Sequence, residues 1–238
     1  MPSSSARTAA AGPHLTQAHV DRTLRVVPDP GPSGRTPLTD EDIAARAAEL
    51  LAEKPPGPLY VFAYGSLIWK PGFDFAARHR ATAPGWHRQF CIEIDGWRGT
   101  PETPGLMLAI VSGGSCTGVA LEAPEAEAQA ALEAMVRRET PYAEFSEMVR
   151  WISIRTEAGP ARALVFWAGP TGERIRRGLP PARAAKMIAH ACGHAGSSTE
   201  YLHNTVAALE AHGIRDRNLW QLQRLVAEEI DSWPAEAG

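Results

Sequence analysis

The sequence VFAYGSLIWKPGFDF, at residues 61–75, joins a strand-like run to a turn. Residues 59–64 carry the apolar and aromatic side chains that favour a β-strand, and Gly65 and Ser66 follow at once. Because Gly65 has no side chain, the backbone can approach another group closely, and successive N–H groups could bind an anion such as a substrate carboxylate. A tight turn that only ends a strand is the other interpretation, and the pattern alone favours it.

Strand patterns continue after this turn. Residues 86–94, WHRQFCIEI, form the next run of β-favouring residues. Residues 106–111 and 117–122 then predict a hairpin joined around Gly113 and Gly114, since glycine pairs are common where two strands turn back on each other.

A second hairpin and a helix come next in the pattern. Residues 147–156 and 162–168 predict two strands with Gly159 and Pro160 in the turn between them. Between the two hairpins, residues 124–139 have apolar side chains at helical spacing after a proline, so they predict a helix.

The remaining periodic segments are helical. Each has one apolar face, and most begin at a residue that can cap a helix; they are residues 39–54, 181–192, 197–213 and the segment after Asp216. Antiparallel strands first and helices last indicate an α+β fold rather than a doubly wound sheet.

The overall composition is that of one globular domain. Of the 238 residues, 44% are hydrophobic and 21% are charged, and the formal net charge is -3. This charge gives no reason to expect nucleic acid or a membrane surface as a partner, so a small-molecule substrate is expected. No run approaches the roughly 18 apolar residues of a membrane span, and the first residues lack the apolar core of a signal peptide.

Cysteine and histidine spacing argues against a metal site. Cys91, Cys116 and Cys192 are far apart and form no CxxC pair, so we expect neither disulfides nor thiolate ligands, and a cytoplasmic location is the simplest consequence. His190 and His194 are four residues apart on a predicted helix, which could place two ligands on one face. No third ligand is evident nearby, and we expect no metal.

Standard motifs exclude several kinds of chemistry. The chain has no GxGxxG after a strand, no GxxxxGK(S/T) and no HExxH, so dinucleotide, P-loop and zincin sites lack their minimal parts and no cofactor is expected. Ser66 is not set in a GxSxG elbow, so a serine nucleophile is not indicated.

The N-terminal part of the chain differs in composition from the rest. Residues 1–38 are rich in Ser, Ala, Gly and Pro with little periodicity, and we predict a flexible tail. Thr39, with Asp42 three residues on, predicts the start of a helix, so residues 39–57 are assigned to a helix and linker. Residues 58–232 are then the main domain.

Four segments stand out as a set. They are residues 61–75, quoted above; residues 86–111, WHRQFCIEIDGWRGTPETPGLMLAIV; residues 136–142, VRRETPY; and residues 193–206, GHAGSSTEYLHNTV. In this order, over about residues 58–230, they resemble the ChaC family of glutathione-specific γ-glutamylcyclotransferases. The chain has Ala63 and Ser198 where that family often has Gly and Asn.

This resemblance implies both a fold and a reaction. The fold would be a mixed β-barrel flanked by helices, with a flexible N-terminal extension. The enzyme would cyclise the γ-glutamyl group of glutathione to release 5-oxoproline and Cys-Gly, without metal or cofactor and with Glu139 as general acid/base. The residues that bind the substrate would be Val61, Phe62, Ala63, Tyr64, Gly65, Ser66, Leu67, Arg98 and Tyr201.

Each of the implied charged and phenolic residues has a structural alternative. We predict that burial raises the pKa of Glu139, although a solvated carboxylate paired with Arg137 or Arg138 is the ordinary interpretation of such a position. Tyr201 could be a core tyrosine with a satisfied hydroxyl, and Arg98 could be a turn residue rather than a partner of a substrate carboxylate.

Three other functions fit the same residues. One is a cyclotransferase that acts on other γ-glutamyl peptides or amines, and another is a relative that binds a ligand without turning it over. The third is a serine hydrolase, which would release free glutamate instead of 5-oxoproline. The products formed from several γ-glutamyl donors distinguish these functions.

Overall fold

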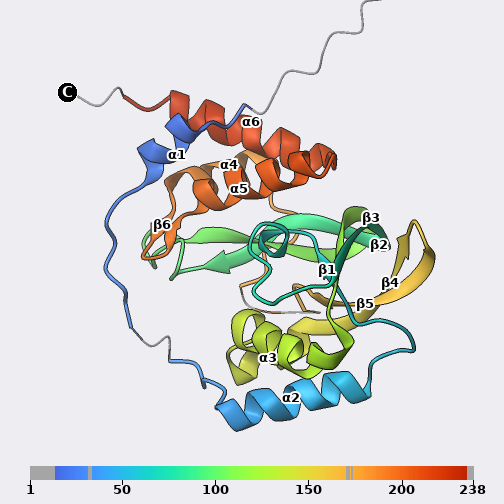
Figure 1. The fold of residues 1–238 in the computed structure, drawn as a ribbon. Coiled ribbons are helices and arrows are strands. Elements are labelled where there is room, and N and C mark those ends of the chain that lie inside the picture. Colours follow the sequence, from blue (N-terminus) through green and yellow to red (C-terminus); the bar gives the residue numbers. More distant parts are fainter. Residues whose placement is uncertain (1–13, 32–33, 170–171, 173, 235–238) are drawn as a thin grey trace, which may run out of the picture.

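A closed five-stranded barrel forms the centre of the molecule (Figure 1). The computed structural model describes residues 14–31, 34–169, 172 and 174–234. Around the barrel the strand order is β1-β3-β2-β4-β5, with β1 and β5 parallel and the other neighbours antiparallel. The predicted α+β fold with a mixed barrel is therefore confirmed. The strands are β1 (Tyr60–Ala63), β2 (Ala77–Ile94), β3 (Gly105–Glu122), β4 (Val149–Thr156) and β5 (Gly159–Phe166).

β2 and β3 are long strands that pair with each other from one end to the other. Each has 18 residues, and their pairing runs from Ala77 opposite Glu122 to Ile94 opposite Gly105. The predicted hairpin between residues 106–111 and 117–122 is therefore wrong, because both runs belong to β3.

The glycines of β3 bend the strand instead of reversing it. Gly113 and Gly114 have φ values of 107° and 74°, and they lie opposite a register shift between Pro84 and Trp86 in β2. Positive φ serves a β-bulge as well as a hairpin turn, so the glycine pair itself does not distinguish the two. The second predicted hairpin, formed by β4 and β5, is confirmed, except that Gly159 and Pro160 belong to β5 and the turn lies at residues 157–158.

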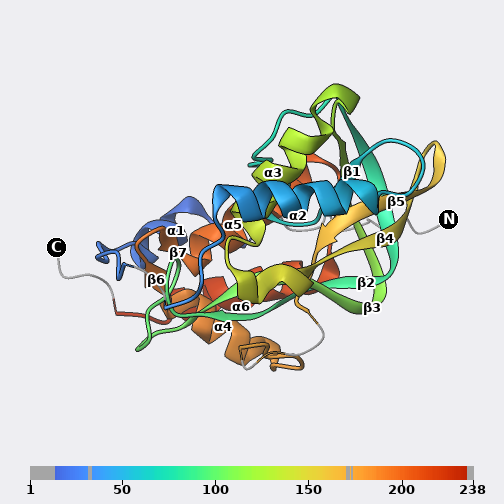
Figure 2. The ribbon, with the colours of Figure 1, turned by 90° about the horizontal axis from the view of Figure 1, so that it is seen from below.

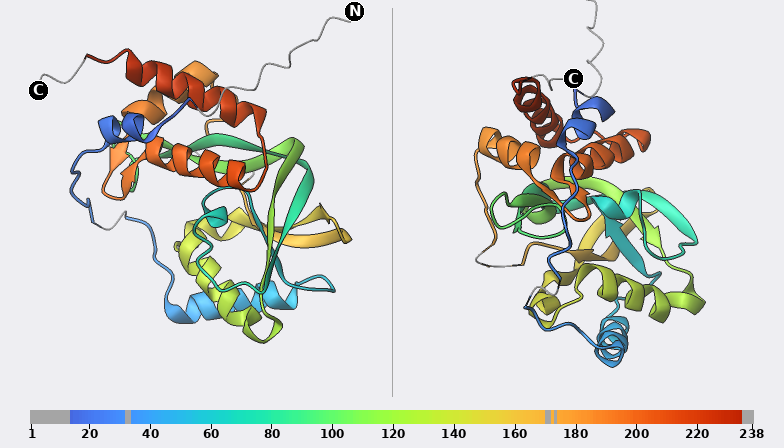
Figure 3. Two further views of the ribbon diagram at one scale, coloured as in Figure 1. Left: turned by 45° about the horizontal axis from the view of Figure 1, so that its top comes forward. Right: turned by 90° about the vertical axis from the view of Figure 1, so that its left-hand side faces the viewer.

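Helices cover the barrel on two opposite sides, as Figures 1 and 3 show. α2 and α3 lie on one side, and Figure 2 views the molecule from that side with α2 in front of α3. The other side is covered by α4, α5 and α6 with the short α1 beside them. The helices are α1 (Gln17–Thr23), α2 (Asp40–Ala52), α3 (Ala128–Glu139), α4 (Pro181–His190), α5 (Ser198–Ala211) and α6 (Arg217–Asp231).

Short elements connect these layers. Single 3-10 turns occur after β1, before α3 and before β4: η1 (Ser66–Ile68), η2 (Glu125–Glu127) and η3 (Ala143–Met148). A two-stranded hairpin, β6 (Cys192–Gly193) with β7 (Gly196–Ser197), precedes α5. Within the described part of the chain, no helix is both long and apolar enough to cross a bilayer.

The predicted helix starts agree with the capping contacts. The Thr39 hydroxyl accepts from the Asp42 N–H at 3.1 Å, and the Ser197 hydroxyl accepts from the Glu200 N–H at 3.0 Å. Asp216 likewise caps α6.

Two groups of buried side chains follow from the alternation of the strands. Alternate residues of all five strands, such as Phe62, Ile110, Ile152 and Val165, form one cluster, consistent with the interior of the barrel. Their neighbours face outward and join the apolar faces of the helices in a larger cluster. Both sides of the barrel wall are thus covered by apolar contacts.

The N-terminal segment departs from the predicted tail over residues 14–31. Leu15 and Val20 are each 1% exposed, and α1 lies beside α5 and α6. The Thr23 hydroxyl donates to the Ser197 hydroxyl at 2.8 Å, and Arg25 donates to the carbonyl of His190. This corrects the expectation for these residues: α1 is too short to give a periodic pattern, but its two buried side chains anchor it. Residues 1–13 lie outside the described chain.

A second contact ties the segment before α2 to the residues after α3. Pro37 and Tyr142 form an antiparallel bridge, in which the Leu38 N–H donates to the Pro141 carbonyl at 2.9 Å. The predicted boundaries at residues 38 and 57, between tail, helix with linker and main domain, stay predictions. The chain on both sides of residue 38 nevertheless contacts the main domain.

Candidate active site

The turn after β1 is anchored from inside the structure by Arg88. This side chain is 1% exposed, its Nε donates to the Tyr64 carbonyl at 2.6 Å, and its Nη2 donates to the Thr117 carbonyl. Its charge is balanced by Asp216, 3.1 Å away, which also caps α6. One buried guanidinium therefore fixes the start of the turn to β3 and α6.

Tyr201, from the first turn of α5, lies against the same turn. A side chain at Gly65 would place its Cβ 3.2 Å from the Tyr201 hydroxyl, so the glycine permits this contact. Burial raises the pKa of Tyr201, and the neighbouring hydroxyl and N–H of Ser66 oppose this. The Tyr201 ring is packed edge-on against Trp69 and Phe90, with centroids 6.3 and 6.0 Å apart.

Glu139 is the last residue of α3, as the sequence predicts, and its side chain is 22% exposed. Its Oε1 is 2.9 Å from Nε of Arg138. Burial raises the pKa of Glu139, and the neighbouring charge of Arg138 opposes this without cancelling it. Both sequence interpretations are thus present together: the carboxyl is desolvated and it is paired with Arg138.

The carboxyl of Glu139 acts electrostatically on two tyrosines. Burial and the negative charge of Glu139 both raise the pKa of Tyr64 and of Tyr201. The Tyr64 hydroxyl donates to the Phe166 carbonyl at 2.6 Å. The fold therefore brings the end of β1, the end of α3 and the start of α5 to one place.

The other predicted binding residues lie around this centre in different roles. Val61, Phe62 and Ala63 are fully buried in the barrel wall, and Leu67 is packed in the large apolar cluster. Val61, Phe62 and Ala63 also pair with β3 through their backbone, so these residues support the turn from the barrel wall.

Arg98 approaches the site from the loop between β2 and β3. Its guanidinium carbon lies 5.6 Å from the centre of the Tyr201 ring. Its Nη1 is 2.6 Å from the Glu200 carboxylate and donates to the Ser197 carbonyl at 2.8 Å. The charge of Arg98 is thus already paired within the protein.

Three residues around the Glu139 carboxyl and the turn after β1 were not among the predicted site residues: Arg138, Trp69 and Arg88. Arg138 stands next to Glu139 and was considered only as its surface partner, and Trp69 lies within the quoted signature. The indole N–H of Trp69 is buried and has no hydrogen-bond partner among the described residues. Arg88 lies within the quoted segment 86–111, but its burial is not evident there, because a buried arginine in a strand looks like any charged residue in an alternating pattern.

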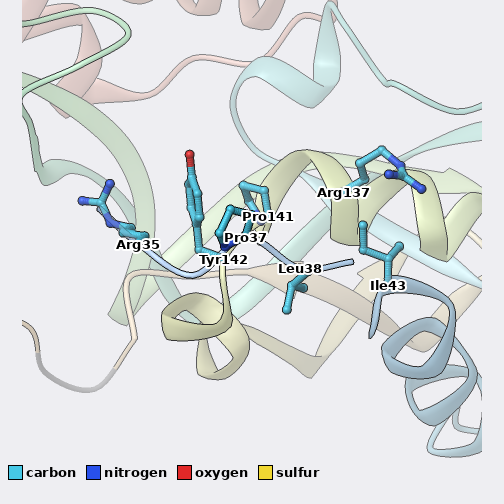
Figure 4. A pocket seen from close by; sticks show the side chains of 7 residues that line it. All are labelled: Arg35, Pro37, Leu38, Ile43, Arg137, Pro141 and Tyr142. Carbon is cyan, nitrogen blue, oxygen red and sulfur yellow. The ribbon is translucent and has the colours of Figure 1, made fainter. Parts of the chain in front are cut away.

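A separate hollow of about 280 Å³ lies where the N-terminal segment meets the residues after Glu139. Figure 4 shows its side chains, with Arg35 and Arg137 at opposite ends of the row. Neither Glu139 nor the turn at residues 61–67 lines it, and we assign the hollow no part in the chemistry. Its lining residues are Arg35, Pro37, Leu38, Ile43, Arg137, Pro141 and Tyr142.

The two histidines considered as ligands are separated by the end of α4. His190 is the last residue of that helix and lies 2.9 Å from Glu229, whereas His194 lies between β6 and β7. In the described ranges, no group of three or more His, Cys, Asp or Glu side chains is placed to hold a metal ion.

The barrel, with a desolvated glutamate beside the turn that follows its first strand, defines the γ-glutamylcyclotransferase fold. A crystal structure of the yeast γ-glutamyl cyclotransferase specific to glutathione has this fold: the TM-score is 0.65 at 21% identity, over 72% of this chain and 96% of that one. The chain belongs to the ChaC family, since the model of the ChaC-like proteins matches residues 59–229.

Curated relatives agree with this assignment. The glutathione-specific γ-glutamylcyclotransferase of Escherichia coli is 32% identical over 196 residues, which are 80% of this chain and 84% of the relative. γ-Glutamylcyclotransferase 2-3 of Arabidopsis thaliana is 32% identical over 187 residues, which are 73% of this chain and 94% of the relative. The matches thus cover most of both proteins.

Proposed function

We propose that this protein is a γ-glutamylcyclotransferase that converts glutathione into 5-oxoproline and Cys-Gly. The observation that carries the proposal is the desolvated Glu139 carboxyl beside Tyr64, Tyr201 and the turn after β1. Family membership and the names of the relatives support the same reaction and the same substrate.

The reaction needs proton transfer rather than a protein nucleophile. The α-amino nitrogen of the γ-glutamyl group attacks its own γ-carbonyl carbon, which closes a five-membered ring, and the bond from that carbon to the cysteinyl nitrogen breaks. Two protons leave the α-ammonium and two reach the departing amine, so neither water nor a net proton is consumed. Because both reacting atoms belong to one molecule, holding the chain curled supplies much of the acceleration.

Glu139 is the group that we assign to these proton transfers. A carboxyl whose pKa is raised toward neutrality takes a proton from the ammonium more readily than an ordinary carboxylate and returns it to the leaving amine. It lies at the end of α3, where Arg138 is its ion-pair partner and its charge acts on Tyr64 and Tyr201.

The turn at residues 61–67 and Tyr201 are assigned to substrate binding. The backbone N–H groups of the turn and the Ser66 hydroxyl would hold the γ-glutamyl group and polarise the attacked carbonyl. Arg98 would support binding indirectly, by holding the ring of Tyr201 in place, because its own charge is already paired with Glu200. The side chains of Val61, Phe62, Ala63 and Leu67 would shape the turn from beneath.

The test is a product assay on the purified protein with reduced glutathione and without metal or nucleotide. Wild type should release 5-oxoproline and Cys-Gly in equal amounts, measured by mass spectrometry. Glu139→Gln should be slower by about 10² to 10⁴, the usual contribution of a positioned general base. Glu133→Gln, in the same helix, is the matched control and should keep wild-type activity.

Other products would point to other functions. Free glutamate instead of 5-oxoproline would mean hydrolysis. Turnover of other γ-glutamyl peptides or amines, with glutathione left intact, would mean a different donor, and binding without any turnover would mean a non-catalytic relative.

A further inference from the structure

Arg138 contacts both halves of the proposed site. Its Nε lies 2.9 Å from Oε1 of Glu139, and its Nη2 donates to the Ser66 hydroxyl at 3.2 Å. Its Nη1 donates to the Lys70 carbonyl, at the far end of the segment that follows the turn. One guanidinium therefore joins the end of α3 to the segment from Ser66 to Lys70.

The segment after the turn is shaped to admit this guanidinium. Gly72 has φ of 82°, and a Cβ added there would lie 3.0 Å from Nη1 and 3.2 Å from Cδ of Arg138. Any other residue would be strained in that backbone conformation and would crowd the arginine. The Pro71–Gly72 pair thus leaves space for the Arg138 side chain.

The contact with Arg138 also limits what the Ser66 hydroxyl can do. Because Nη2 donates to the Ser66 oxygen, the hydrogen of that hydroxyl is directed elsewhere. Ser66 in turn lies close enough to Tyr201 to lower the pKa of the phenol, against the effect of burial. Arg138 therefore acts on the binding turn through Ser66, next to Tyr201.

We infer that Arg138 is a positioning residue of the reaction, which holds the Glu139 carboxylate and the Ser66 hydroxyl in fixed relation to each other. The inference rests on the proposed function. Arginine suits this task because its planar fork presents several N–H donors at once, whereas a lysine ammonium presents one compact charge. Lysine could keep the charge beside Glu139 but could not reach all three partners.

The electrostatic consequence has a definite sign. Among the described residues, Arg138 from α3, Tyr64 from the end of β1 and Tyr201 from α5 are the groups that interact electrostatically with the Glu139 carboxyl. Of these three, Arg138 carries the positive charge, which favours the ionised carboxylate. Removing that charge leaves burial unopposed, so the pKa of Glu139 should rise further.

The experiment compares Arg138→Met and Arg138→Lys with Arg137→Met. Arg137 is the neighbouring arginine of the same helix, but it points to the surface and pairs with Asp40 at 2.7 Å. We expect Arg138→Met to lower kcat/KM at neutral pH by tenfold or more and to move the acidic limb of the pH profile up by about one unit. Arg138→Lys should keep the limb near its wild-type place but still raise KM, and Arg137→Met should stay within about twofold of wild type.

The pH profile separates positioning from a merely structural role. If Arg138 only stabilised the fold, Arg138→Met would lower the melting temperature and the amount of active enzyme without moving the acidic limb, and the inference would be overturned. Should Arg138→Met not fold, Arg138→Gln replaces it, since it keeps a polar side chain without the charge.

A measurement without substrate distinguishes this inference from the proposed function. The Glu139 carboxyl carbon can be titrated by NMR in protein labelled with ¹³C-glutamate, its signal being assigned from its loss in Glu139→Gln. An upward shift of its pKa in Arg138→Met, with none in Arg137→Met, supports the pairing even if glutathione is not the donor. An unchanged titration would refute the inference even if wild type turns glutathione over.

Discussion

The burial of the Glu139 carboxyl, which suits its proposed role as acid/base, also costs stability. Its carboxyl is desolvated beside Tyr64 and Tyr201, and this raises its pKa in the folded protein above the ordinary value of the unfolded chain. The folded state then binds the proton more tightly than the unfolded state, so this group's contribution to stability is largest at low pH. That contribution is lost as pH rises through the raised pKa, and the loss is about 1.4 kcal/mol for each pH unit that separates the folded pKa from the unfolded one.

A prediction for stability follows at the residue scale. Glu139→Gln should melt at a higher temperature than wild type at pH 7.5, because the neutral amide avoids the desolvated charge, although it gives up the contact with Arg138. The difference should shrink at pH 4.5, where wild type carries the proton itself. Thermal unfolding at the two values checks this, and a variant less stable than wild type at both would contradict it.

The site residues divide by whether a local pattern can reveal them. Glu139 and the turn at Gly65 and Ser66 lie in sequence strings whose resemblance to a family implies a role for them, so they could be predicted. Arg138 and Arg88 lie in strings of the same set, but their roles depend on which carbonyls and carboxylates the fold brings within reach of a guanidinium, so these roles could not be predicted. A side chain's sequence neighbours do not contain that information.

At the scale of elements, Ser197 is the N-cap of α5, the helix that places Tyr201 in the proposed site. Its hydroxyl accepts from the Glu200 N–H at 3.0 Å and from the Thr23 hydroxyl at 2.8 Å, and the helix that it caps carries Tyr201 in its first turn. Losing this hydroxyl leaves a buried N–H unpaired and loosens the turn of α5 on which Tyr201 lies.

Ser197→Ala should therefore destabilise the protein by about 1–2 kcal/mol and raise KM for glutathione. Thr39→Ala removes the corresponding cap of α2, away from Tyr201, and should cost about 1 kcal/mol with KM unchanged. Urea unfolding and steady-state kinetics on both variants make the comparison. Equal KM values in the two variants would mean that the cap of α5 does not position Tyr201.

Capping residues and apolar spacing predicted the helices from α2 to α6, whereas α1 was missed and the first predicted hairpin was wrong for a physical reason. The glycine pair at Gly113 and Gly114 permits positive φ in both a turn and a bulge, and alternation is the same on either side of it. The deciding contact is with β2, whose first half, from Ala77, was not recognised as a strand at all. Which strands pair in the barrel depends on two segments at once, so the pattern of one segment cannot predict it.

At the scale of the whole molecule, the described residues before β1, 14–31 and 34–59, contact two opposite sides of the domain. α1 lies beside α5 and α6, and α2 lies on the opposite side of the barrel against α3, as Figures 1 and 3 show. The family match begins at residue 59, so this segment adds buried contacts outside the matched region. Composition alone suggested a tail because a few buried residues, spaced far apart, suffice to hold such a segment.

Two valines of this segment test whether it belongs to the domain. Val20 is 1% exposed, and Val26 is fully exposed. Val20→Ala should lower the free energy of unfolding by about 1–3 kcal/mol, since it leaves a cavity beneath α1. Val26→Ala should change it by less than about 0.5 kcal/mol. If both variants changed the free energy of chemical unfolding by equally small amounts, α1 would not unfold cooperatively with the rest of the domain.

The parallel contact that closes the barrel has a consequence for how the chain folds. Val61 of β1 lies opposite Leu164 of β5, so the barrel cannot close until most of the polypeptide has left the ribosome. The turn after β1 is synthesised early, yet Tyr201, which lies against it, emerges after β5. Until then β1, β2 and β3 can pair with one another, but the outer edge of β1 has no partner, and open strand edges of this kind favour association of folding intermediates. The proposed active site is therefore one of the last parts of the molecule to be completed.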